Sequence, residues 1–182
     1  MTPQIILGIL LAGLLSNNYP ILYFLGTGAV VENERTAKRS LLLGLGTTIV
    51  MVLGTLVTWP IEHFLLHDMP YLRTLVFVAV LLVIVGVLHL IIKNSVEKFC
   101  HVDFVKFALN GAVLGLCIHN AHHSFGEALV TALGIGIGFM VAMTIFAGLY
   151  HRIDEESVPK AFRGFPINLL IAGMMALCFL AF

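Results

Sequence analysis

Histidine is the side chain best suited to ligand chemistry in this chain, and three of its eight histidines are clustered. His119, His122 and His123 stand at positions i, i+3 and i+4, which share one face of a helix. Imidazole is the commonest side-chain ligand of transition metals. The spacing therefore indicates a metal or haem site formed by these three residues. The alternative is that they are solvated side chains of a polar loop covering residues 119–127.

Polar side chains also interrupt two stretches that are otherwise apolar. Asn17 and Asn18 break the first stretch, which resumes with Thr27, and Asn110 lies in a short stretch that covers residues 104–118. Side chains and freed carbonyls at broken membrane helices can bind ions. These four residues are therefore candidates for an ion path. In the alternative interpretation, they only satisfy the hydrogen bonds of the broken backbone.

Other catalytic or ligand-binding patterns are missing from the sequence. The three cysteines form no close pair, so their spacing predicts neither a disulfide framework nor a zinc site. Gly134, Gly136 and Gly138 lie within an apolar stretch, where close helix packing is a better explanation than phosphate binding. The net charge is zero, and nucleic acid is not an expected partner. We expect at most a non-catalytic subunit of a larger enzyme.

The elements that position these residues are predicted to be membrane helices. Of the 182 residues, 59% are hydrophobic and only 11% are charged, whereas soluble domains carry roughly a quarter charged residues. A spanning helix needs about 20 apolar residues. Because backbone polar groups in lipid must be satisfied within the segment, the spans are predicted to be helices and the fold class to be all-α. Six segments are expected, covering residues 5–25, 40–58, 72–92, 104–118, 128–150 and 165–182.

The basic residues predict how these helices are oriented. Nine of the ten lysines and arginines lie in or beside three alternate loops, which follow segments one, three and five. The tenth is Arg73, at the start of segment three. Cytoplasmic loops carry the excess of lysine and arginine. The three basic loops are therefore predicted to be cytoplasmic, and both termini to lie outside.

The two halves of the chain share a short pattern. Residues 24–30 (FLGTGAV) and 107–113 (FALNGAV) have phenylalanine, glycine, alanine and valine at equivalent places. Each half contains three predicted helices, so repeats over residues 1–92 and 93–182 would have opposite orientations in the membrane. Interrupted segments at equivalent positions of inverted repeats indicate a site at the midplane. We expect one membrane domain of six helices in two inverted three-helix repeats, with helices one and four interrupted.

Several short strings give the chain a resemblance to a known family. They include residues 17–19 (NNY), 71–75 (YLRTL), 112–115 (AVLG) and 162–164 (FRG). With these strings the chain resembles the Rnf/Nqr membrane subunits over nearly its whole length, and in particular the A subunit of the Rnf complex, which is equivalent to the E subunit of Nqr. The resemblance implies a subunit of an ion-translocating electron-transport complex in a bacterial or archaeal cytoplasmic membrane. It also implies a heterodimer with a sister subunit of inverted topology.

The resemblance further implies a [2Fe–2S] cluster at mid-membrane, to which each subunit of the heterodimer gives two cysteines. In the family these cysteines lie in the two interrupted helices, and the matching positions here are Gly28 and Gly111. Iron–sulfur clusters need thiolate ligands, with histidine as the rare substitute. We therefore expect the family's cluster to be absent from this chain, and we predict no other cofactor for it.

Three functions remain open at this point. The first is a divergent membrane subunit of an Rnf/Nqr-type complex without its own [2Fe–2S] ligands, whose partners are the lipid bilayer, other subunits of the complex and the sister subunit. The second is a small inverted-repeat transporter or channel-like protein with no redox role, which pairs with a second copy of itself and which the missing cysteines favour. The third is a histidine-based haem or metal protein.

Overall fold

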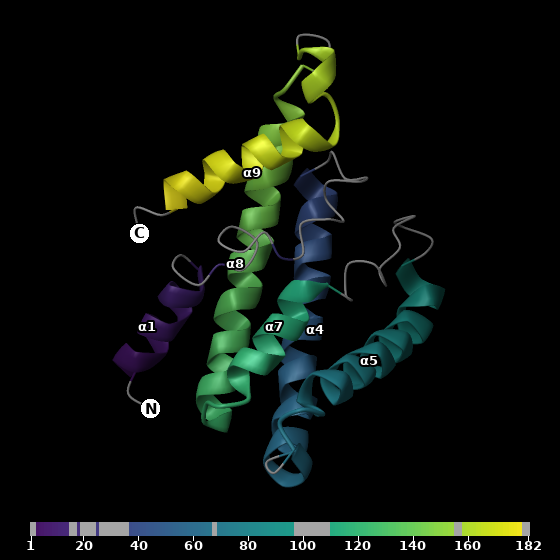
Figure 1. The fold of residues 1–182 in the computed structure, drawn as a ribbon, viewed down its shortest axis with the longest axis vertical. Helices are drawn as coiled ribbons and strands as arrows, with labels where there is room; N and C mark the ends of the chain where they lie inside the picture. The colour runs from purple at the N-terminus through teal and green to yellow at the C-terminus, as the bar shows by residue number, and fades with distance from the viewer. Residues whose placement is uncertain are drawn as a thin grey trace.

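All the regular structure in the described part of the chain is helical (Figure 1). The computed structural model describes residues 3–14, 18, 25, 37–66, 69–96, 110–154 and 158–179, without the side chains of residues 37–39 and 91–96. The α-helices are α1 (Pro3–Leu14), α4 (Ala37–Ile61), α5 (Arg73–Val96), α7 (Gly111–Asn120), α8 (Phe125–His151) and α9 (Phe165–Phe179). A π-helical turn, η1 (Glu62–Leu66), continues α4, and a short 3-10 turn, η2 (Lys160–Phe162), precedes α9.

Three helical stretches are long and apolar enough to cross a membrane, namely Ser40–Leu66, Arg73–Leu90 and Phe125–His151. They confirm the expected segments 40–58, 72–92 and 128–150 as helices and place the chain among membrane-embedded proteins. The described parts of the other three expected segments form the shorter apolar helices α1, α7 and α9. Parts of segments 5–25 and 104–118, including residues 19–24 and 104–109, lie outside the described residues, so the relation of two inverted repeats stays a prediction.

Two of the helix boundaries that differ from the sequence prediction have a local reason. Helix α4 continues past the expected end at Thr58 and contains Pro60, after which the chain widens into η1. Proline lacks a backbone donor, and the wider turn follows directly where the regular ladder is disturbed. Helix α8 begins at Phe125, three residues before the expected start, because Ser124 and Glu127 form a capping box in which the Glu127 carboxylate accepts from the Ser124 amide at 3.4 Å.

The centre of the bundle is an antiparallel pair, α4 and α8. Thr48 donates to the carbonyl of Gly136 at 2.8 Å, and a Cβ on Gly44 would lie 2.7 Å from the Cα of Met140. Residues 44 and 48 of α4 therefore lie beside residues 140 and 136 of α8, so the two helices run in opposite directions. Half of each span is buried inside the protein, against 17% of the α5 span, so α5 is peripheral and presents most of its apolar surface outward. Such a surface is suited to lipid.

Helix α1 packs on the other side of α8 and runs parallel to it. A Cβ on Gly13 would lie 2.8 Å from the backbone of Gly134, and one on Gly138 would lie 2.6 Å from the carbonyl oxygen of Gly13. The alternating glycines of α8 thus serve two neighbours, because Gly134 and Gly138 face α1 while Gly136 faces Thr48 of α4. The sequence interpretation of these glycines as close helix contacts is confirmed.

Four helix termini gather at one end of the bundle. They are the end of α4, the start of α5, the end of α7 and the start of α8 (Figure 1, lower end). The described polar and titratable residues of 62–73 and 119–127 are thereby brought to the same end.

Candidate functional site

The most polar part of this end is a cluster formed by the buried Glu62, the partly buried Arg73 and the exposed His122. Arg73 forms an ion pair with Glu62 and a hydrogen bond of 2.9 Å, through Nη1, to Nε2 of His122. The Glu62 side chain is 8% exposed and that of Arg73 18%. One further atom of each, Oε2 of Glu62 and Nε of Arg73, is buried without a hydrogen-bond partner. Three elements, η1, α5 and the turn after α7, are held together by this cluster.

Neighbouring side chains fix the turn that carries the histidines. Trp59 donates through its indole N–H to the backbone carbonyl of His123 at 2.9 Å and stacks on His63, with ring centroids 5.2 Å apart. The buried amide of Asn120 donates to the Thr55 hydroxyl at 3.2 Å and to the Ala128 carbonyl at 3.0 Å. The turn between α7 and α8 is therefore anchored to α4 at two points.

The three clustered histidines do not share one helix face. Helix α7 ends at Asn120, so only His119 is helical, and His122 and His123 lie in the turn that follows. His122 faces Arg73, whereas the rings of His119 and His123 lie 5.0 Å apart. Among the residues that the structure describes, no three His, Cys, Asp or Glu side chains are grouped closely enough to hold a metal ion. The arrangement on one helical face is wrong, and the metal site itself stays a prediction.

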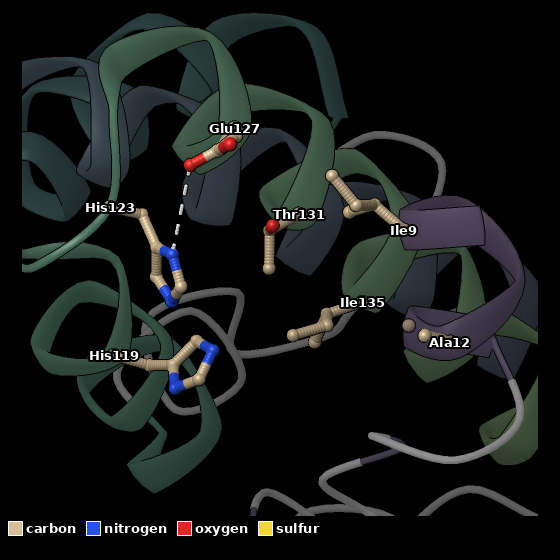
Figure 2. A pocket seen from close by; sticks show the side chains of 8 residues that line it. Ile9, Ala12, His119, His123, Glu127, Thr131 and Ile135 are labelled. Atoms are coloured by element: carbon tan, nitrogen blue, oxygen red, sulfur yellow. Dashed lines mark ion pairs between the residues drawn. The ribbon is translucent and has the colours of Figure 1, made fainter. Parts of the chain in front are cut away.

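His119 and His123 instead line a cavity of about 280 Å³ between α1, α7 and α8. Its polar wall also contains Glu127 and Thr131, and its apolar side includes Ile9 and Ala12 of α1 (Figure 2). His119 lies beyond the predicted span 104–118, in the polar stretch 119–127. Burial lowers the pKa of His119, and the nearby His123 and His122 lower it further. Both effects favour the neutral form of the His119 imidazole.

Two of the four ion-path candidates can be placed, and both satisfy backbone groups. Asn18 donates through Nδ2 to the carbonyls of Leu14 at 3.1 Å and Gly138 at 2.9 Å, which ties it to α8. Its Oδ1 is buried without a hydrogen-bond partner. Asn110 is the N-cap of α7, where its Oδ1 accepts from the amide of Val113 at 3.0 Å. Asn17 and Thr27 lie outside the described residues.

Position 111 is the first residue of α7 and lies against the other interrupted segment. A Cβ on Gly111 would lie 3.0 Å from Cδ2 of Leu25. Glycine offers no ligand atom, and iron–sulfur clusters require thiolates. The nearest cysteine in sequence, Cys117, is buried with its Sγ turned toward Gly54 of α4, so it does not replace a ligand at position 111. The residues at this position therefore do not fit a [2Fe–2S] cluster, and Gly28 lies outside the described residues.

Comparison with known proteins identifies the family. The sequence model of the Rnf-Nqr subunits, described as membrane proteins, matches residues 6–182. The chain belongs to the Rnf-Nqr family. It is 34% identical over 181 residues to the A subunit of the ion-translocating oxidoreductase complex of Syntrophotalea carbinolica, covering 96% of this chain and 94% of that protein. It is 32% identical, with the same coverage, to the A subunit of the Na⁺-translocating ferredoxin:NAD⁺ oxidoreductase complex of Acetobacterium woodii.

A third Rnf-Nqr relative gives the same result. The chain is 35% identical over 181 residues to the A subunit of the ion-translocating oxidoreductase complex of Azoarcus sp., again covering 96% of this chain and 94% of the relative. These relatives are subunits of multi-subunit complexes by name. The resemblance to Rnf/Nqr membrane subunits, and to the A subunit among them, is confirmed over nearly the whole chain.

The sequence did not single out the residues that organise this end of the Rnf-Nqr fold. Glu62 and Asn120 had no signal of their own, because their partners are distant in sequence. Arg73 did have a signal in the sequence, because it is the only lysine or arginine away from the three basic loops. A lone charge at the end of an apolar helix requires a partner when it is buried, and that requirement points to Glu62 in the preceding loop.

Proposed function

We propose that this chain is the A subunit of an Rnf-type ion-translocating electron-transport complex, and that it forms half of the complex's membrane core. The match to the family over residues 6–182 supports the proposal, as do relatives of nearly equal length that are themselves A subunits. The chain has no arrangement suited to independent catalysis among its described residues. The role that we propose for it in the complex is that of a membrane scaffold.

The proposed site of action is the bacterial or archaeal cytoplasmic membrane, with both termini outside. The described residues of 62–72 and 119–127, two stretches without lysine or arginine, lie at the same end of the bundle, which supports this orientation by the positive-inside rule. Arg73, a basic residue on that side, forms an ion pair with Glu62. The parallel packing of α1 on α8 supports an N-terminus on the same side as residues 119–127.

The proposed architecture is a pair of inverted three-helix repeats that meets a sister subunit of opposite topology. The contact between Leu25 and Gly111 supports this, because it joins the two segments that share the FxxxGAV pattern. The N-cap at Asn110 supports a break at that place in the predicted segment 104–118, since an N-cap marks where a helix begins.

The proposed complex differs from the family pattern in one respect, which is that this chain supplies no ligands to a [2Fe–2S] cluster. Gly111 is the observation that carries this part of the proposal. It occupies the position of a family cysteine, it has no side chain, and the cysteine nearest to it in sequence is turned into the α4 interface. Any electron transfer through the complex would then bypass ligands on this chain.

Native purification followed by mass spectrometry of the purified assembly tests the assignment to a complex. The proposal predicts co-purification of an inverted-topology membrane sister and of redox subunits. The second candidate function, a small transporter or channel, is favoured by the loss of both cysteines. It predicts a homodimer with no further subunits, and that result would contradict the proposal.

A further inference from the structure

The pair His119 and His123 is set apart from the other histidines at this end of the bundle. The ring centroids are 5.0 Å apart with planes inclined by 46°, and both rings line the cavity between α1, α7 and α8. His122 is committed to Arg73, and His63 is stacked on Trp59. The cavity-lining pair is thus available for a ligand in a way that the other two histidines are not.

The spacing of the two rings matches that of imidazoles sharing one metal ion. A tetrahedral Zn²⁺ bound at about 2.0–2.1 Å to one nitrogen of each ring holds the two centroids about 5 Å apart. The observed separation therefore needs no movement of the backbone to admit an ion.

Glu127 lies beside Nδ1 of His123, at a distance longer than a hydrogen bond. Its Oε2 lies 3.9 Å from Nδ1 of His123, and Figure 2 shows His123 between Glu127 and His119 along the polar wall of the cavity. A metal-bound histidine almost always donates its other ring N–H to a carboxylate, a backbone carbonyl or water. With Nδ1 directed at Glu127, Nε2 of His123 is left for an ion shared with His119.

We propose that His119 and His123 bind a divalent transition metal of the Zn²⁺ type at the wall of this cavity, with Glu127 as the positioning residue of His123. The volume of about 280 Å³ leaves room for water or a donor from another molecule to complete the coordination. The third histidine expected from the sequence, His122, takes no part. This proposal is independent of the electron-transport role, because it rests only on the geometry of α7, α8 and the turn between them.

Titration of the detergent-solubilised full-length protein with Zn²⁺ tests the proposal, provided that no polyhistidine tag is present. We expect one Zn²⁺ per chain, and at least a tenfold weaker affinity in each of His119→Ala and His123→Ala. His122→Ala and His63→Ala are the matched controls and should bind as the unaltered protein does. Equal binding by the His119→Ala/His123→Ala double variant would overturn the proposal, and so would an equally large loss in His122→Ala.

Glu127→Gln separates the positioning role of Glu127 from its role in helix capping. Glutamine keeps the capping box but removes the negative charge. Loss of such a carboxylate partner typically weakens metal binding 10–100-fold, so we expect a loss in that range, with partial rescue by Glu127→Asp. An unchanged affinity in Glu127→Gln would exclude the positioning role.

X-ray absorption at the zinc edge provides a second measurement that needs no variant. The unaltered protein loaded with one Zn²⁺ should show two imidazole nitrogens at about 2.0–2.1 Å, with water or a donor from another molecule completing the coordination shell. A spectrum without imidazole scattering, or with three imidazoles, would contradict the two-histidine site even if the alanine variants fail to fold.

Discussion

Arg73 shows how a single residue departs from the charge pattern of the chain without contradicting it. The other nine basic residues lie in or beside three alternate loops of the sequence prediction, and Arg73 lies at the end of the bundle where α4 ends and α8 begins. Its charge is compensated by Glu62 and its remaining hydrogen-bonding capacity is shared with His122. A buried arginine paired in this way contributes little to the charge bias that sets topology, because its field is neutralised locally.

Removal of either partner of this ion pair should destabilise the protein strongly. Breaking a buried pair by removing one partner typically costs about 3–5 kcal/mol, because an uncompensated charge remains. Arg73→Met and Glu62→Gln should each lower the midpoint of thermal unfolding in detergent. The double variant Glu62→Leu/Arg73→Met should lose much less than the sum of the single variants, and Lys160→Met, at an exposed cation, should lose nothing. Additive single and double effects would show that the pair is not coupled.

The N-cap of α7 provides a smaller, local prediction. Replacing an N-cap asparagine with alanine costs about 1 kcal/mol, because an amide in the first turn loses its acceptor. Asn110→Ala should therefore increase hydrogen exchange at the amide of Val113, which donates to Asn110 at 3.0 Å. Asn110→Ser keeps an acceptor and should retain most of the protection. Equal exchange in both variants would exclude the capping role.

The chemistry of individual residues was only partly predictable from the sequence. The spacing of His119, His122 and His123 implied one helical face, but α7 ends at Asn120, where the buried Asn120 amide bonds to Thr55 and Ala128. Because the bond between Asn120 and Thr55 joins positions 65 residues apart, no local pattern in the sequence indicates it. The break residues were recognised by their polarity, and Asn18 and Asn110 indeed satisfy backbone groups.

The elements were predictable where hydropathy alone determines them. Helices α4, α5 and α8 follow directly from their apolar stretches, since a helix is the structure that satisfies an isolated backbone in lipid. Their ends depended on local chemistry that hydropathy does not contain, such as Pro60 before η1 and the capping box of α8. The direction of α1 relative to α8 came only from the glycine contacts of the folded chain.

The interface of α1 with α8 should be sensitive to a single methyl group. A Cβ on Gly138 would meet the backbone oxygen of Gly13 at 2.6 Å, which only separation of the helices can relieve. Gly138→Ala should therefore destabilise the protein by about 1–3 kcal/mol, as overpacking does. Gly148→Ala on the same helix meets nothing within 4 Å and should be neutral or slightly stabilising. Equal unfolding midpoints for the two variants would contradict the close packing of α1 on α8.

The whole molecule is a membrane-embedded member of the Rnf-Nqr family whose most polar described end gathers a charged cluster and a histidine-lined cavity. The proposed orientation places that end outside the cell. It also gives an even number of crossings, with both termini on the side of residues 119–127.

Reporter fusions test this orientation directly. Alkaline phosphatase is active only outside the cytoplasm, and green fluorescent protein exported unfolded does not fluoresce. Phosphatase fused at either terminus should be active, whereas fluorescent protein at either terminus should stay dark. A fluorescent C-terminal fusion together with an active N-terminal phosphatase would give an odd number of crossings and exclude the six-helix arrangement.

The most direct test of the central proposal, an Rnf-type subunit without cluster ligands, is electron paramagnetic resonance of the reduced protein co-expressed with its membrane sister. The account predicts no [2Fe–2S] signal from the unaltered pair, because Gly28 and Gly111 supply no thiolate. It predicts a signal, with two irons per heterodimer, when Gly28→Cys and Gly111→Cys are introduced together, and none with Gly111→Cys alone. A stoichiometric [2Fe–2S] signal from the unaltered pair that requires this chain would contradict it.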